Sequence, residues 1–107
     1  MMLAVNAVIL AASELTDYSR EDIIGRRRHQ GLARVRHAVA AVSRRENKGA
    51  LSYPMIAWRL GKRDHSTIMS SIRAAEDLEK RDPTYADFMA RLCHRAREIG
   101  GDYILRI

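Results

Sequence analysis

The stretch KRDHSTI, residues 62–68, places cations, an anion, an imidazole and two hydroxyls side by side, directly before an apolar run. Asp64 is suited to cap a helix whose apolar stripe contains Ile68, Ile72 and Ala75. A simple cap does not need such a mixture of hydrogen-bonding groups. Asp64 is therefore open to two interpretations, an N-cap or a binding group, and one carboxylate can be both.

A shorter helix is predicted just before this one. Ser52 is a suitable N-cap, Pro54 falls in the first turn, where its missing N–H costs little, and Gly61 ends the helix. Helix 52–60, a glycine-containing turn and helix 64–79 together have the layout of a helix-turn-helix. In that motif the second helix enters the major groove of DNA and its N-terminal residues touch base edges.

The side chains at the start of the second helix suit base recognition. Asp64 can accept from a cytosine amino group, and His65 can donate to a purine or pack on a thymine methyl group. Ser66 or Thr67 can serve a base or a phosphate, while Arg63 would clamp a phosphate. The plainer alternatives are a buried His65 and a Thr67 that is ordinary helix surface. Three consecutive residues cannot converge as a Ser–His–Asp triad does, so we expect no catalytic residue and no enzyme activity.

The rest of the chain is also helical in pattern, which predicts an all-α fold of about six helices. Gly25 in a left-handed conformation, Gly49 in a polar loop and the pair 100–101 are expected to end helices. Residues 102–107 could pack on the body or fray, and residues 1–107 are interpreted as one domain. Four other helices are expected. The first spans about 3–16, with Leu15 in its apolar stripe, and a short second helix follows the capping box SRED (19–22). The other two run from Leu32 to about Arg45 and from Pro83 to Ile99.

Positive charge is concentrated in one part of the chain. Residues 20–48 contain nine Lys and Arg but three Asp and Glu, and this difference of six equals the net charge of the whole chain, +6. Within it, RRRHQG (26–31) lacks apolar periodicity and is predicted to be a basic loop. Focused positive charge suits a polyanion such as nucleic acid, although a solvated face is the plainer alternative.

Several classes of protein are disfavoured. Cys93 is the one cysteine, so there is no disulfide framework and no cysteine metal cluster, and we expect a small buried side chain there. The opening MMLAVNAVILAAS lacks the basic region of a signal peptide and is too short to span a bilayer. We expect a cytoplasmic protein without membrane, metal or cofactor, and the oligomeric state stays open.

GKRDHSTI (61–68) resembles the signature of the C-terminal DNA-binding domain of the bacterial replication initiator DnaA, which typically reads G-x-R-D-H-[ST]-T-[VI]. The similarity extends backward through REDIIGRRR (20–28), ARVRHAVA (33–40) and LSYPMIAWRLG (51–61). It covers roughly residues 5–95 and implies the all-α, helix-turn-helix fold of that domain.

The resemblance also implies roles for individual residues. Asp64, His65 and Ser66 would read bases in the major groove, and Arg28 would enter the adjacent minor groove. A narrow A·T-rich minor groove attracts arginine for physical reasons too, although Arg28 could instead be a solvated loop residue. The implied contacts to the DNA backbone are Arg63, Thr67, Arg26, Arg27, His37, Arg44 and Pro54.

The sequence departs from the family pattern in places. His37 replaces the usual Gln, Val35 stands where many members have Pro, and the loop at 46–51 is slightly longer. Leu60 replaces an aromatic residue. Met55, Trp58 and Arg59 alter the face of the first motif helix, and the pattern leaves open whether Trp58 is exposed or buried.

The nucleotide-binding motif G-x-x-x-x-G-K-[ST] of the initiator is absent from this sequence. We therefore expect no ATPase activity, and we interpret the chain as a natural small protein rather than an excised domain. Such a protein would occupy initiator-like sites on double-stranded DNA and regulate replication initiation or transcription, with the initiator or other replication proteins as further partners. Two alternatives are a protein-interaction module that binds the initiator or another DNA-processing protein, and a structured-RNA binder.

Overall fold

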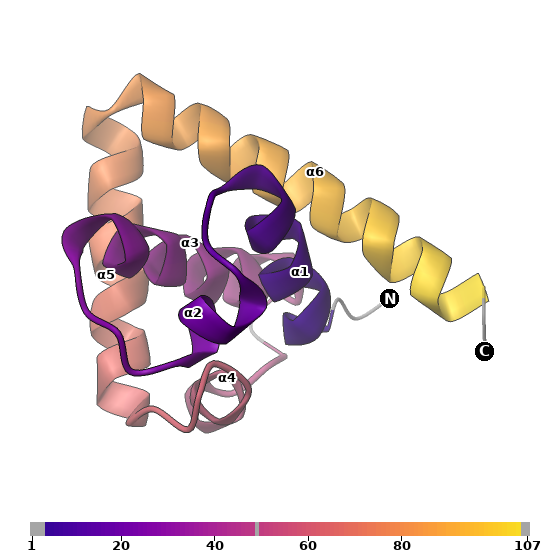
Figure 1. The fold of residues 1–107 in the computed structure, drawn as a ribbon, viewed down its shortest axis with the longest axis horizontal. Helices are drawn as coiled ribbons and strands as arrows, with labels where there is room; N and C mark the ends of the chain where they lie inside the picture. Colours follow the sequence, from indigo (N-terminus) through magenta and orange to yellow (C-terminus); the bar gives the residue numbers. More distant parts are fainter. Residues whose placement is uncertain (1–3, 49, 106–107) are drawn as a thin grey trace.

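The structure, a computed structural model, describes residues 4–48 and 50–105, and this part of the chain contains six α-helices and no strand. Helix α3 packs most extensively against α5, and α1 against α6, which runs along one side of the molecule (Figure 1). The all-α prediction is confirmed. No helix among the described residues has the length and apolar character needed to cross a membrane. The helices are α1 (Val5–Leu15), α2 (Arg20–Ile24), α3 (Gln30–Glu46), α4 (Tyr53–Arg59), α5 (His65–Arg81) and α6 (Pro83–Leu105).

Side-chain caps fix the starts of four helices. The Ser19 hydroxyl accepts from the Asp22 N–H, and the Asp22 carboxylate accepts from the Ser19 N–H, each at 3.1 Å. This capping box begins α2 as predicted. Ser52 caps α4, Asp64 caps α5 and Asp82 caps α6 through hydrogen bonds to N–H groups of the first turn. These four predicted starts are confirmed.

The core draws on all of these helices. The predicted stripe of α3 is buried, while Leu15, which was expected in the stripe of α1, ends its helix and is 38% exposed. Cys93 is half-buried rather than buried, and its thiol donates to Glu46 Oε1 at 2.9 Å. Burial, followed by that acceptor, raises the pKa of Cys93 to about 11. Large core side chains include Ile9, Ile23, Leu32, Ile56, Ile68, Met89 and Leu92.

Two predictions about glycine were wrong. Gly25 is extended, with φ −83° and ψ −170°, and a Cβ there would lie 2.7 Å from the Glu21 carbonyl oxygen. Close approach, and not a left-handed turn, is why glycine suits this position. The pair at 100–101 does not end α6, which continues through it to Leu105. Glycine inside a helix costs about 1 kcal/mol relative to alanine, which is too little to force an end.

The helices next to the predicted loops begin and end at slightly different residues from those predicted. Helix α3 begins at Gln30, so the basic loop is shorter than the predicted 26–31. Gly49 lies outside the described residues. The residues 102–105 of the tail, whose conformation the sequence left open, are the last turn of α6.

The turn between α4 and α5 fixes the place of the second motif helix. Gly61 and Lys62 both have positive φ, at 95° and 58°. A Cβ on Gly61 would lie 2.1 Å from the Ile24 carbonyl oxygen, so the turn lies directly against the end of α2. The start of α5 and the basic loop that follows α2 are therefore neighbours.

Candidate nucleic-acid interface

The start of α5 presents four consecutive exposed side chains, Asp64, His65, Ser66 and Thr67. Asp64 Oδ1 accepts from the Ser66 N–H at 3.1 Å, and this hydrogen bond is the main reason why the pKa of Asp64 lies below its usual value. His65 Nδ1 lies 3.6 Å from the same carboxylate oxygen. His65 is thus exposed and not buried in the core, and Asp64 is an N-cap whose charge also faces solvent.

The start of α4 lies close to a cation. Pro54 is exposed in the first turn of this helix. The Arg44 guanidinium donates from Nη1 to the Leu51 carbonyl oxygen and lies over the Tyr53 ring, 4.2 Å from its centroid. These contacts hold the charge of Arg44 beside the entry to α4, where a phosphate contact was predicted.

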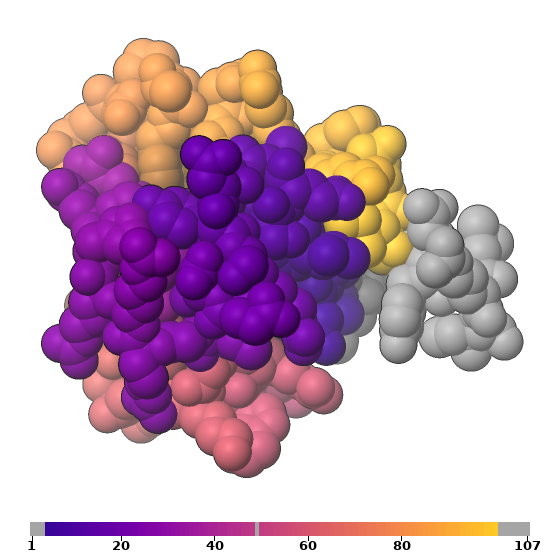
Figure 2. Space-filling view, in the orientation of Figure 1, coloured from indigo at the N-terminus to yellow at the C-terminus, as the bar shows by residue number. Residues whose placement is uncertain are grey.

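The basic loop presents three exposed arginines, Arg26, Arg27 and Arg28. Arg27 Nη1 lies 3.9 Å from Asp22 Oδ1, a distance at which an exposed pair contributes little. Figure 2 shows the purple segment that contains this loop beside the salmon surface of α4 and the start of α5. The arginine run and the first turn of α5 thus belong to one region of the surface.

Arg36 holds the basic loop from the inside and is 8% exposed. Its planar guanidinium replaces the donors that are missing at the C-terminal end of α2, where a helix leaves carbonyl groups unpaired. No role was predicted for this residue from the sequence. Its Nε donates to Ile23 O at 2.8 Å, its Nη1 to Arg27 O at 2.7 Å, and its Nη2 to Asp22 O at 2.7 Å and to Gly25 O at 2.9 Å.

Arg63 adds a second guanidinium to the same carbonyl groups. Its Nη2 donates to Gly25 O at 2.6 Å and lies 3.4 Å from Ile23 O. Its Nε is buried and has no hydrogen-bond partner among the described residues. Burial, followed by the charges of Arg26 and Arg28, lowers the pKa of Arg63. The structure therefore gives Arg63 an internal role, in which it ties the entry of α5 to the basic loop, and its predicted phosphate contact stays a prediction.

His37 lies on α3 and is half-buried. Burial, followed by the charge of Arg36, lowers the pKa of His37. The imidazole is therefore mostly neutral near neutral pH, since the ordinary pKa of His is already about 6.5. A contact from His37 to a DNA phosphate, as predicted, would be a hydrogen bond from a neutral ring.

A hollow of about 320 Å³ joins the two motif helices on this surface. The sequence left Trp58 undecided, and the structure shows it 62% exposed. Lys62 Nζ lies 5.0 Å from the centroid of its ring. The four-residue spacing of Pro54 and Trp58, which puts both on one face of α4, was the available signal. The residues that line the hollow are Pro54, Trp58, Lys62, Arg63, Asp64 and His65.

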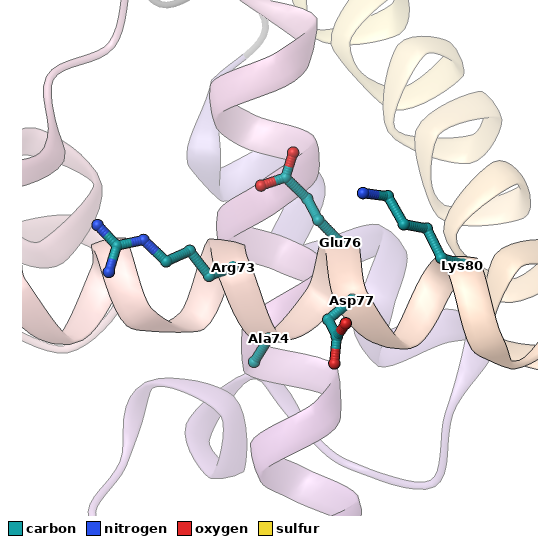
Figure 3. Close-up of a pocket in the computed structure, with 5 residues that line it drawn as sticks. All are labelled: Arg73, Ala74, Glu76, Asp77 and Lys80. Atoms are coloured by element: carbon teal, nitrogen blue, oxygen red, sulfur yellow. The ribbon is translucent and has the colours of Figure 1, made fainter.

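A second depression follows the outer side of α5 and is lined by residues of this helix alone. Figure 3 shows that the charged ends of these side chains do not converge on one point. The arrangement offers no constellation that would hold a small ligand. Its residues are Arg73, Ala74, Glu76, Asp77 and Lys80.

Comparison with known proteins gives a consistent result. The family described as "Bacterial dnaA protein helix-turn-helix" matches residues 5–74. The chain belongs to this family. The chromosomal replication initiator proteins DnaA of Neisseria meningitidis serogroup C and Neisseria gonorrhoeae are 31% identical over 91 residues, 85% of this chain. The corresponding protein of Caulobacter sp. is 26% identical over 95 residues, 89% of this chain. No solved structure gives a significant match.

The match identifies the chain as a DnaA-like helix-turn-helix DNA-binding domain and confirms the resemblance. The chain spans 17% of the length of the Neisseria relatives and 19% of the Caulobacter relative. The residues of this chain that match the DnaA family, 5–74, contain every predicted contact residue, from Arg26 to Thr67, and the first part of α5. Helix α6 lies beyond the matched residues.

Proposed function

We propose that this chain binds double-stranded DNA sequence-specifically at sites that resemble DnaA boxes, with the start of α5 in the major groove and Arg28 in the adjacent minor groove. One observation supports this most directly. Four exposed polar side chains, residues 64–67, lie beside three exposed arginines, residues 26–28, and Arg63 connects the two segments. One protein surface can in this way meet two neighbouring grooves of a duplex.

The chemistry of the exposed groups suggests which of them contact bases and which contact the DNA backbone. Asp64, His65 and Ser66 supply an acceptor, an imidazole and a hydroxyl at the base edges, which differ in their donor and acceptor patterns in the major groove. The backbone contacts fix the register of the protein on the duplex without reading sequence. These contacts are assigned to Arg26, Arg27, His37, Arg44, Pro54, Arg63 and Thr67.

A consequence for the cell follows from site occupancy. A protein that binds initiator-type boxes would compete with or assist any initiator that uses the same boxes. Because the 107 residues contain no G-x-x-x-x-G-K-[ST] motif, the proposed action is occupancy and not ATP-driven work by these residues. Regulation of replication initiation or of transcription is the proposed outcome, with the initiator or other replication proteins as further partners.

The test is a fluorescence anisotropy titration at one physiological salt concentration. Its targets are a labelled duplex that carries a DnaA-type box, a scrambled duplex of the same composition, and an RNA hairpin. We expect a preference of roughly a thousandfold for the box over the scrambled duplex, the low end for specific DNA binders. Lys80→Ala, which removes a cation from the far end of α5, is the matched control and should bind as the wild type does.

Three results would contradict the proposal. Equal affinity for the box and the scrambled duplex would reduce the function to non-specific DNA binding. Tighter binding to the RNA hairpin than to the box duplex would favour the structured-RNA alternative. Binding to none of the three nucleic acids would favour a protein-interaction module.

A further inference from the structure

Helix α4 carries an exposed tryptophan that the fold does not use. Trp58 is 62% exposed, although tryptophan has one of the largest apolar surfaces of any side chain. A single exposed apolar residue needs no explanation, but this one is accompanied. Lys62 Nζ lies 5.0 Å from the centroid of the indole ring, so a cation is held against its face.

The backbone at Lys62 supplies a second observation. Its φ is 58°, in the left-handed region that glycine adopts freely and that other residues enter at a cost of about 1–3 kcal/mol. Gly61 before it already has φ 95°, so the turn runs through two left-handed residues. The geometry of the turn by itself favours glycine here, so it does not account for the lysine side chain.

The position of this pair relative to the recognition helix limits the partner. Trp58 and Lys62 line the same hollow of about 320 Å³ as Asp64 and His65. The hollow is therefore continuous with the surface proposed to read bases. The hollow combines the apolar surfaces of Trp58 and Pro54 with the cations Lys62 and Arg63, and a wholly apolar protein partner would leave those charges unpaired. A strand of DNA fits better, because each nucleotide offers an apolar deoxyribose edge next to an anionic phosphate.

We propose that Trp58 and Lys62 hold one nucleotide of the DNA backbone beside the recognition helix. The indole ring packs on the deoxyribose, and the Lys62 ammonium pairs with the adjoining phosphate while it stays over the ring. This contact rests on the proposed DNA binding and adds to the backbone contacts already assigned a further sequence-independent hold, on one sugar and its phosphate. Because it touches sugar and phosphate alone, it strengthens binding to any duplex.

The chain carries its own probe, because Trp58 is its one tryptophan. The intact protein is titrated with the box duplex and with the scrambled duplex, and quenching of tryptophan emission by acrylamide is measured at each point. We expect the quenching constant to fall at least about twofold when either duplex is bound, since burial of this exposed ring excludes the quencher. Anisotropy of the labelled duplex measures binding independently in the same sample.

Three variants separate the contact from general effects. Trp58→Ala and Lys62→Gly should each weaken binding about tenfold, by a similar factor on box and scrambled DNA. Lys62→Gly should also reduce the salt slope by about 0.9, the value for one phosphate, and should leave thermal stability unchanged or higher because glycine relieves the left-handed strain. Met55→Ala is the control, because Met55 is 50% exposed on the same helix but does not line the hollow, and it should bind as the wild type does.

The outcomes distinguish this inference from the proposed function. If the wild type binds the box duplex while the quenching constant stays at its free value, Trp58 remains open to solvent and the inference fails, although the proposed function stands. A loss with Met55→Ala as large as that with Trp58→Ala also overturns it, in favour of a general apolar face for a protein partner. If anisotropy shows no binding to any duplex, the proposed function fails and this contact fails with it.

Discussion

Replacement of Arg36 by alanine should both destabilise the fold and release the basic loop. The guanidinium makes four hydrogen bonds to carbonyl oxygens at distances from 2.7 to 2.9 Å, and the residue is 8% exposed. A hydrogen bond to a charged group contributes about 1.5–3 kcal/mol, but these four share one side chain, and water can reach some of the freed carbonyl groups. We therefore expect the free energy of unfolding to fall by about 3–4 kcal/mol, well below the sum of four separate hydrogen bonds of this kind.

The assay is thermal and urea unfolding followed by far-UV circular dichroism. A loss of about 3–4 kcal/mol should lower Tm by roughly 12–16 °C, taking about 4 °C per kcal/mol for a domain of this size. Arg36→Lys keeps the charge but lacks the planar fork, so it should recover less than half of the loss. Arg34→Ala is the control, because Arg34 is an exposed cation on the same helix, and it should change stability by less than about 0.5 kcal/mol.

A free energy of unfolding of Arg36→Ala within about 1 kcal/mol of that of Arg34→Ala, the scatter expected of surface changes, would refute this role of Arg36. That result would mean that the loop carbonyl groups are satisfied by water and that the buried guanidinium is incidental. The effect of Arg36→Ala on DNA binding is measured separately. At a temperature where Arg36→Ala is folded, a released loop should weaken the dependence of binding on an A·T-rich flank but leave discrimination within the box.

Further predictions concern contacts and protonation. His65→Ala should cost about 1–3 kcal/mol at the box, measured by anisotropy, and much less on scrambled DNA. Arg28→Ala should weaken binding most where the flank is A·T-rich, and an equal loss on a G·C flank would make Arg28 a phosphate contact. With about five phosphate contacts, log K plotted against log salt should have a slope of roughly −4 to −5, and a flat response would exclude a polyanion. Because the pKa of His37 is lowered in the fold, the unfolded chain binds more protons than the folded chain as the pH falls below about 6.5. Stability, measured by urea unfolding, should therefore decrease as the pH falls below that value, and His37→Gln should remove this part of the decrease.

Local chemistry explains why much of the fold could be predicted. Ser19, Ser52, Asp64 and Asp82 cap helices through hydrogen bonds to N–H groups two or three residues away, so a short sequence window contains all the information. The apolar stripes repeat every three or four residues for the same reason. The candidate contacts at 64–67 were predictable because their exposure follows from their place before the first buried residue of the stripe.

What could not be predicted depends on contacts between distant segments. The Gly25 carbonyl oxygen accepts from Arg36 and Arg63, which lie 11 and 38 residues away, and no residue close in sequence encodes these contacts. Arg36 looked like one more cation of a basic segment, yet its partners lie 9 to 14 residues away, and those of Arg63 lie 38 and 40 residues away. Neither pattern nor propensity distinguishes an arginine that binds DNA from one that binds the backbone of its own chain.

The two internal arginines explain how an arginine-rich loop can be held rigid by its own backbone. Like charges repel, and burial, followed by the charge of Arg63, lowers the pKa of Arg36. The carbonyl oxygens at the C-terminal end of α2 carry partial negative charge and receive both guanidinium groups, which offsets that repulsion. The loop is therefore fixed without using the side chains of Arg26 and Arg28, which stay exposed for the proposed contacts with the DNA backbone and the minor groove. We expect a loop that is held in this way before DNA arrives to lose less conformational freedom on binding, so that the proposed groove contacts of the loop and of α5 form as one unit.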